Sequence, residues 1–364
     1  MTAISTLGRY MSKRFAVSIF SVFVLCYILI FFIDFIEILR EGGKKGGAST
    51  GLLALITFLR LPAFTELILP FAVLIGAMGA FLTFSRSSEL VVIRSAGMSV
   101  WQFLQPGLLV ALVIGVGAVT VYNPLAAMAK AYSERLYAES FGGEKSVLSK
   151  GRGGAWLRQD GVDGQSIVYA KAVADRGVSL GGVTLLQFDS NKKFLERVEA
   201  QKATLKSGYW QLENAHVSSA DGQSQFYKTY IVSTFLTPEQ ATESIGSVES
   251  VSFWELPKFI EFTERAGLSS EKYKLYYQTL LAKPLLMAAM VLVAATCTLR
   301  SFRFGRIQTM VIAGLASGFG FFILSELSRK LGTSGLTPAT VAAWAPAVIA
   351  TFLALTVLLN QEDG

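Results

Sequence analysis

Hydrophobic residues are concentrated in two blocks of the chain, residues 15–125 and 275–360, on either side of a polar middle. Charge-poor runs of about 20 residues recur in these blocks, and a helix needs a run of that length to cross a bilayer. The run 52–84 is too long for one straight crossing and contains Arg60, Glu66 and two prolines, so we expect its first third to be a kinked or interfacial lead-in. The six predicted spans are 15–33, 52–84, about 100–122, 276–299, 307–327 and 337–359.

The polar middle consists of short stretches separated by turn residues at roughly ten-residue spacing. The breaks are Asp-Ser-Asn, Ser-Gly and Asp-Gly, which favour tight turns between strands. This rhythm predicts antiparallel β structure of the sandwich, barrel or jelly-roll type. A polar helix and loop are expected before it, over residues 126–155. The predicted strands are 165–173, 178–188, 193–206, 209–218 and 225–235.

The predicted fold class is therefore an α+β membrane protein with six transmembrane helices, three before and three after an inserted antiparallel β-domain. A hydrophobic share of 52% with only 16% charged residues agrees with a membrane protein that carries some soluble mass. We divide the chain into residues 1–125, with the first three spans, residues 126–268, with the β-domain and its flanking helices, and residues 269–364, with the last three spans.

A short polar-rimmed segment, residues 84–106, separates two of the predicted spans. Ser87 or Ser88 can cap a helix start, Glu89 lies in the first turn, and Gly97 can end the helix. The resulting helix, at about 87–97, is too short to cross a bilayer. It is either a linker helix in the membrane interface or a docking helix through which a partner outside the membrane moves the adjoining spans.

The distribution of basic residues predicts the orientation of the chain. An even number of spans puts both termini on one side, and the bias of Lys and Arg assigns that side to the cytoplasm and the β-domain to the opposite side. The net charge of +7 needs no nucleic-acid partner, because loops that flank spans are commonly basic. The inner cations are Arg9, Lys13, Arg14, Arg86, Arg94, Arg300, Arg303 and Arg306; the outer ones are Arg40, Lys44, Lys45, Arg329 and Lys330.

Motifs of enzyme chemistry are missing from the sequence. Residues 142–146, Gly-Gly-Glu-Lys-Ser, resemble a phosphate-binding loop only superficially, and there is no nucleophile elbow or zinc-protease motif. The single His216 has no Cys/His cluster around it, and Cys26 and Cys297 lie in apolar runs as buried thiols, so no metal site or disulfide is expected. The charged residues near the membrane are few and peripheral, which argues against a proton relay through the bilayer. We expect no catalytic residue, and a partner must supply the energy for any work.

Taken together, the pattern resembles the LptF/LptG family of lipopolysaccharide export permeases over essentially the whole chain. Asp34 and Glu37 at the end of the first span resemble the LptG branch more than the LptF branch. The residues that carry the resemblance are Leu61-Pro62, Glu66, Leu69-Pro70, Ser88-Glu89-Leu90, Ala96-Gly97-Met98-Ser99, Trp156-Leu157, Ala200, Ala203, Trp210-Gln211-Leu212, and the stretch from Tyr273 to Lys283-Pro284.

The resemblance implies a subunit of an ATP-driven ABC transporter in the bacterial inner membrane. Such a permease extracts lipopolysaccharide from the inner membrane and passes it to a periplasmic bridge, and its inserted domain is a periplasmic β-jellyroll. The implied partners are an LptF-like sister permease, a dimeric cytoplasmic LptB-like ATPase and a single-span LptC-like protein. ATP and Mg²⁺ belong to the ATPase in this arrangement, so the chain itself binds no cofactor.

Three groups of residues are candidates for this function. The first is the ATPase-coupling helix, where Glu89 would meet an arginine of the ATPase; otherwise Glu89 only complements the helix dipole. The second would bind lipid phosphates at the outer end of the first span, unless it is a solvated loop. The third would line an acyl-chain path in the jellyroll, unless it is an ordinary core; alternation places some of its members inward. These groups are Glu89, Arg94, Ser88 and Leu90; Arg40, Lys44 and Lys45; and Val168, Leu185, Phe188, Leu205, Leu212 and Phe226.

Acyl-chain extraction explains why such a protein needs an ATPase. Exposing one twelve-carbon chain to water costs on the order of 10 kcal/mol, so several chains do not leave a bilayer at a useful rate without a driven step. Two other functions stay open: a membrane-anchored periplasmic scaffold or binding module, and a permease that transmits force to periplasmic partners without transporting lipid. A plain anchor needs only one or two spans, which favours the transporter.

Overall fold

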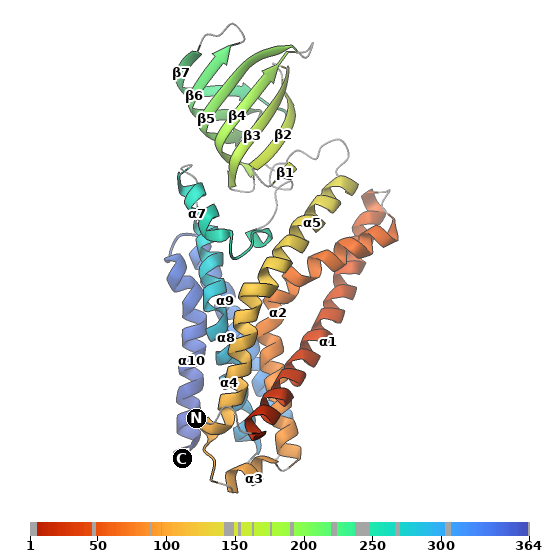
Figure 1. Cartoon of the computed structure of the whole chain (residues 1–364), viewed down its shortest axis with the longest axis vertical. Coiled ribbons are helices and arrows are strands. Elements are labelled where there is room, and N and C mark those ends of the chain that lie inside the picture. Colours follow the sequence, from red (N-terminus) through yellow and green to blue (C-terminus); the bar gives the residue numbers. More distant parts are fainter. Residues whose placement is uncertain are drawn as a thin grey trace.

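The computed structural model describes most of the chain, and its outline is a helical bundle with a curved β-sheet at one end (Figure 1). The described residues are 6–45, 49–87, 89–95, 97–141, 149–151, 154–161, 164–174, 177–189, 193–219, 224–236, 248–265, 270–302 and 307–362.

In the described part of the chain, six helices are long and apolar enough to cross a membrane. Each overlaps one of the predicted spans, although the last begins at Ala339, two residues later than predicted, and they are arranged three before and three after the sheet, as expected. The third is formed by α4, a π-helical turn η1 and α5, which follow one another without a break past residue 125. The helices are α1 (Thr6–Lys45), α2 (Thr50–Arg86), α3 (Glu89–Ser95), α4 (Val100–Gly117), η1 (Ala118–Tyr122), α5 (Asn123–Phe141), η3 (Val248–Ser250), α7 (Leu256–Arg265), α8 (Glu271–Phe302), α9 (Ile307–Thr333) and α10 (Ala339–Glu362).

The bundle is packed around α8, which lies against α2, α4, α9 and α10. Two glycines allow helices to approach closely: a Cβ on Gly76 would lie 2.5 Å from the Cα of Ile19 in α1, and one on Gly115 would lie 2.6 Å from the Cα of Pro284 in α8. Near α3, aromatic side chains of α1, α2 and α4 fill the core, with Phe15 and Phe81 in edge contact at 5.1 Å. The chain thus reaches the dense packing that a membrane bundle relies on.

The two ends of the bundle differ. The start of α1, the short helix α3 and the end of α10 lie at one end, and the sheet lies at the other (Figure 1). This arrangement follows from the number of spans. Three spans carry the chain from its start to the end of the bundle where the sheet is inserted, and three more bring it back.

The sheet has seven described strands, each antiparallel to its neighbours and ordered as they occur in the chain. The predicted antiparallel insert is therefore confirmed, and within the described residues the expected jellyroll takes the form of one curved meander. Strands β3 to β7 match the five predicted strands, whereas β1 and the start of β2 lie where a loop was expected. The strands are β1 (Ser149–Gly151), β2 (Gly154–Gly161), β3 (Gly164–Ala174), β4 (Ser179–Phe188), β5 (Phe194–Lys206), β6 (Tyr209–Ser219) and β7 (Ser224–Ser233).

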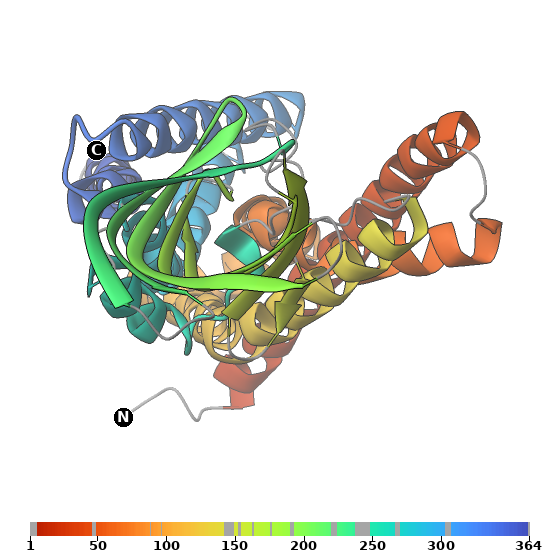
Figure 2. The same cartoon turned by 90° about the horizontal axis from the view of Figure 1, so that it is seen from above.

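The sheet curls round on itself when seen from above (Figure 2). Leu157 of β2 and Val232 of β7 belong to the same buried cluster, which requires the concave face to close around a common core. A crease across the strands adds to the bend. Gly182 and Asn214 have positive φ angles of 59° and 54°, and the residue pairing of their strands is interrupted there. Because of this crease, the spacing between successive buried residues increases locally from two positions to three in β4, β5 and β6. The pairs with the wider spacing are Leu180 and Val183, Ala200 and Ala203, and Leu212 and Ala215.

Candidate functional site

The short helix α3 joins α2 directly to α4 at the end of the bundle opposite the sheet (Figure 1). Ile93 anchors it to the bundle core and is only 7% exposed, whereas Val92 is 64% exposed and faces outward. Gly97, with φ 79°, allows the chain to turn after the helix, and the Ser99 side chain then caps α4 by accepting from the Gln102 N–H at 3.3 Å. The helix is therefore held to the bundle by Ile93, while Val92 and Ser95 are exposed.

Glu89 is the first residue of α3 and is tied to the start of α1. The Tyr10 hydroxyl donates to Glu89 Oε1 at 3.2 Å, and Arg14 Nε donates to the Tyr10 hydroxyl at 3.1 Å. The Arg14 guanidinium also lies 5.3 Å from the centre of the Tyr10 ring. Sequence reasoning missed this contact because Tyr10 and Glu89 are far apart in the chain. This contact links α3 to α1, in addition to its chain connections to α2 and α4.

The other predicted coupling residues are only partly described. Ser87 ends α2 by donating its N–H to the Thr83 carbonyl at 3.1 Å, so it does not begin α3. Ser88 lies outside the described residues, and Leu90 and Arg94 belong to α3 with side chains that the structure does not describe. Their role in coupling stays a prediction.

The three cations predicted to bind lipid phosphates lie at the end of α1 that is nearer the sheet (Figure 1). Arg40 is exposed, and Lys44 and Lys45 form the end of the helix with side chains that are not described. The helix α1 extends twelve residues past the predicted first span, to Lys45. A different cation is paired nearby: Arg60 Nη2 lies 3.6 Å from Oδ1 of the buried Asp34. Phosphate binding by the three predicted cations stays a prediction.

The sheet separates the six predicted acyl-path residues into two sets. Val168, Leu185, Leu205 and Leu212 lie on the buried concave face and are at most 2% exposed. Phe226 is 54% exposed and pairs with His216 on the opposite face. Phe188 is also on that face, because its neighbour in β3 is Gln165 and the adjacent Ser166 is buried.

The concave face is filled by its own side chains in this conformation. Trp210 is buried in it and donates Nε1–H to Gln159 Oε1 at 2.8 Å, and the Thr234 hydroxyl donates to the same oxygen at 2.9 Å. Gln159 in turn donates to Ser166 at 2.9 Å. A lipid chain could reach Leu212 or Leu185 only after the curled sheet had opened, since both are buried now.

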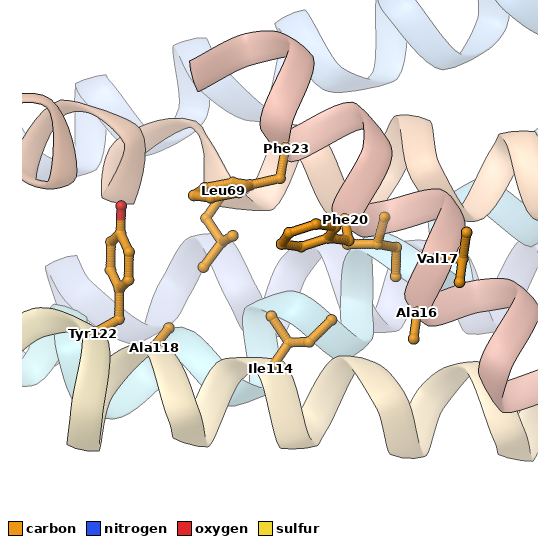
Figure 3. Close-up of a pocket in the computed structure, with 9 residues that line it drawn as sticks. Ala16, Val17, Phe20, Phe23, Leu69, Ile114, Ala118 and Tyr122 are labelled. Atoms are coloured by element: carbon orange, nitrogen blue, oxygen red, sulfur yellow. The ribbon is translucent and has the colours of Figure 1, made fainter. Parts of the chain in front are cut away.

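An apolar cavity of about 530 Å³ lies in the bundle between α1 and α4–η1 (Figure 3). The Tyr122 ring closes one end of it, and its hydroxyl is 2.5 Å from the Thr65 hydroxyl of α2. The sequence does not reveal this cavity, because its walls come from three helices. The lining residues are Ala16, Val17, Ile19, Phe20, Phe23, Leu69, Ile114, Ala118 and Tyr122.

A buried ion pair crosses the bundle between α2 and α8. Lys283 Nζ donates to Glu66 Oε1, and the two side chains are 9% and 7% exposed. The sequence-based view that charged residues are peripheral is wrong for this pair, because each charge is compensated inside the bundle. The available signal was that Glu66 and Lys283 both interrupt apolar stretches, and an ionisable residue in a span is a functional candidate by default.

The comparisons with known proteins agree with this architecture. Residues 9–360 match the family model described as lipopolysaccharide export system permease LptF/LptG. The chain is 23% identical to the Escherichia coli (strain K12) protein named lipopolysaccharide export system permease protein LptG, with 100% of both chains covered. It is also 23% identical to the Haemophilus influenzae protein of the same name, with 99% of this chain and 100% of the relative covered. The chain therefore belongs to the LptF/LptG family of lipopolysaccharide export system permeases.

Proposed function

We propose that this chain is the LptG-type permease subunit of an ATP-driven exporter that extracts lipopolysaccharide from the inner membrane and passes it toward a periplasmic bridge. The proposal rests on one observation above all: α3 and the sheet lie at opposite ends of a six-helix bundle (Figure 1). A force applied at one end can therefore act on lipid in the bundle and deliver it at the other.

In this proposal α3 faces the cytoplasm, together with both termini, and the sheet is periplasmic. An LptB-like ATPase docks on α3, with Glu89 as the charged contact and Ser88, Leu90 and Arg94 around it. The link from Glu89 to Tyr10 lets the same movement act on α1. An LptF-like sister permease and a single-span LptC-like protein complete the complex, and ATP and Mg²⁺ are bound by the ATPase.

The lipid route in this proposal begins at the apolar surfaces of the bundle. The cavity beside α1 (Figure 3) has the character that acyl chains require, since its walls are almost wholly apolar. Arg40, Lys44 and Lys45 would then meet the phosphates at the outer end of α1. Beyond the membrane, the concave face of the sheet offers an apolar path that keeps chains out of water, where each would cost on the order of 10 kcal/mol.

The test uses photo-crosslinking amino acids in the assembled transporter, reconstituted in vesicles that contain lipopolysaccharide. A crosslinker at Leu212, on the concave face, should capture lipopolysaccharide only when ATP is hydrolysed. The matched control is Phe226, on the neighbouring strand but the opposite face, where we expect no ATP-dependent capture. Equal capture at both positions, or capture at Leu212 without ATP, would favour a binding scaffold and contradict the proposal.

A further inference from the structure

The buried pair Glu66–Lys283 belongs to a larger polar cluster that no part of the proposed lipid route uses. Asn123, at the start of α5, donates its amide to both carboxylate oxygens of Glu66, at 3.2 and 3.1 Å. The same amide donates to the Tyr276 hydroxyl of α8 at 2.8 Å. Asn123 is fully buried, so the cluster joins the second, third and fourth spans inside the bundle. Removing a buried charge from its partner is costly, which keeps these three helices together at this level.

The three main members of the cluster lie at points where their helices can bend. Glu66 lies between Pro62 and Pro70 of α2. Lys283 immediately precedes Pro284 of α8. Prolines and π-helical turns are the common sites of sharp helix bends.

The third helix can bend at the same level for a different reason. Asn123 directly follows the π-helical turn η1, and its N–H donates to the Ala118 carbonyl five residues earlier. Proline also follows it, at position 124. Single π-helical turns inside α-helices occur frequently at functional sites.

The cluster also holds the chain segment that returns from the sheet to the bundle, which we call the return segment, residues 248–255. Asn123 Oδ1 accepts the backbone N–H of Phe253 at 2.8 Å. Trp254 donates Nε1–H to the Thr120 carbonyl of η1 at 3.2 Å. The Phe253 ring stacks on Tyr277 of α8, with 5.4 Å between the ring centres.

The return segment is also attached to the helix that leads toward the sheet. Lys130 of α5 and Glu249 of the return segment form an ion pair at 3.1 Å. The return segment is thus held by the third and fourth spans, at the level of the buried cluster.

From this geometry we propose that Glu66, Lys283 and Asn123 form a joint that transmits bending of α2 and α8 to the sheet through the return segment. The joint deepens the proposed function and rests on it, because it supplies the link between driven spans and the domain that receives lipid. Glu66 and Lys283 keep the two helices in register while they bend. Asn123 passes the displacement to the backbone of the return segment. These are positioning residues, and none of them needs to touch lipid.

The first test is the double variant Glu66→Gln, Lys283→Met in the assembled transporter, reconstituted with lipopolysaccharide. Replacing both members of a buried ion pair by neutral groups of similar size is often neutral for stability, so the variant should assemble and hydrolyse ATP. We expect the lipopolysaccharide transferred per ATP hydrolysed to fall by about fivefold or more, the size of a typical coupling between sites. A purely structural ion pair predicts unchanged transfer per ATP in the double variant, and that result would overturn the joint.

The matched control is Thr65→Val. Thr65 is also buried in α2, and its hydroxyl contacts the Tyr122 hydroxyl of the third span and the Leu61 carbonyl of its own helix, none of which belongs to the ion pair. This variant removes a buried polar contact between α2 and the third span, whereas the ion pair joins α2 to α8, so Glu66, Lys283 and Asn123 are all unchanged. It should keep wild-type transfer per ATP; an equal loss in this control would assign the effect to general disturbance of the bundle and contradict the proposal.

A second measurement separates the joint from the proposed function. Spin labels at the exposed positions Ser219, in the sheet, and Ser334, between α9 and α10, report the distance from the sheet to the bundle in a background with Cys26 and Cys297 replaced. Trapping the ATPase with nucleotide should change this distance in the wild type but not in the double variant. If the wild type moves the sheet but transfers no lipopolysaccharide, the proposed function fails and the joint stands. An identical distance change in the double variant would overturn the joint.

Discussion

Glu89 combines several roles at one end of the bundle. As the first residue of α3 it complements the helix dipole, which stabilises a helix by about 0.3–1 kcal/mol. It also accepts a hydrogen bond from Tyr10, which connects α3 to α1. A third role, as the contact with the ATPase, would bring a cost of about 2–5 kcal/mol when an interfacial charge pair loses one partner.

These roles predict different results for different substitutions. Glu89→Lys should release the ATPase from the complex, because repulsion replaces attraction, while the permease still folds and inserts. Tyr10→Phe is the matched variant, since it removes the bond to Glu89 and leaves the charge in place. It should keep the ATPase bound but lower ATP-driven lipid transfer. Copurification and transfer assays measure the two effects, and normal assembly and export with Glu89→Lys would end the docking hypothesis.

At the scale of helices, close contact between neighbouring helices depends on a few glycines. Gly115 of α4 lies directly against Pro284 of α8, where a Cβ would be 2.6 Å from the Pro284 Cα. Gly117, two residues later in the same helix, has nothing within 4 Å of a Cβ position. Two glycines in one helix thus have opposite surroundings.

We expect Gly115→Ala to destabilise the folded bundle by about 1–3 kcal/mol, because α4 and α8 must move apart to admit the methyl group. Gly117→Ala should be neutral or slightly stabilising, since alanine is the better helix former and meets no neighbour. Thermal unfolding of the purified variants in detergent, compared side by side, measures the difference. Equal unfolding temperatures for the two variants would show that α4 and α8 are not packed as described.

Strands and helices differ in what the sequence reveals about them. Strands β3 to β7 are predictable because turn residues bound each of them. The short β1 has no such pattern. The faces of the strands are harder still, since the crease at Gly182 and Asn214 shifts the alternation by one residue. Within β4, beyond the crease, a period of two still separates Phe188 from Leu185, but the face of Phe226, on another strand, is decided by the register between strands.

At the scale of the whole molecule, the six spans are predictable from hydropathy and the inserted sheet from its turn residues, but the contacts between spans are not. Glu66 and Lys283 are 217 residues apart in the chain, and their pairing depends on how α2 packs against α8. The same holds for the bond between Tyr10 and Glu89. Family resemblance pointed to Glu66 and Lys283 as characteristic residues, but only the folded bundle shows that they meet.

The last prediction concerns the difference between the two ends of the molecule, and it is made for the end of α1 nearest the sheet. Arg40, Lys44 and Lys45 place three cations on the proposed outer side, against the usual bias of membrane proteins. A cation that only extends into water has no role in transport. A cation that contacts lipid phosphates forms a charge-assisted hydrogen bond, and reversing its charge turns that attraction into repulsion.

Replacing all three by Glu should therefore lower lipopolysaccharide crosslinking near α1 and weaken the stimulation of ATP hydrolysis by lipopolysaccharide. Each readout should fall by about tenfold if each contact contributes a few tenths of a kcal/mol to 1 kcal/mol. The matched control reverses Lys258 and Lys330, which are also exposed and lie in α7 and near the end of α9, away from α1. This control should leave both readouts unchanged, because it changes the overall charge of the proposed outer side but leaves the residues at the end of α1 as they are. Intact crosslinking and stimulation in the triple variant would assign these cations to a solvated helix end and leave the lipid phosphates to other residues of the complex.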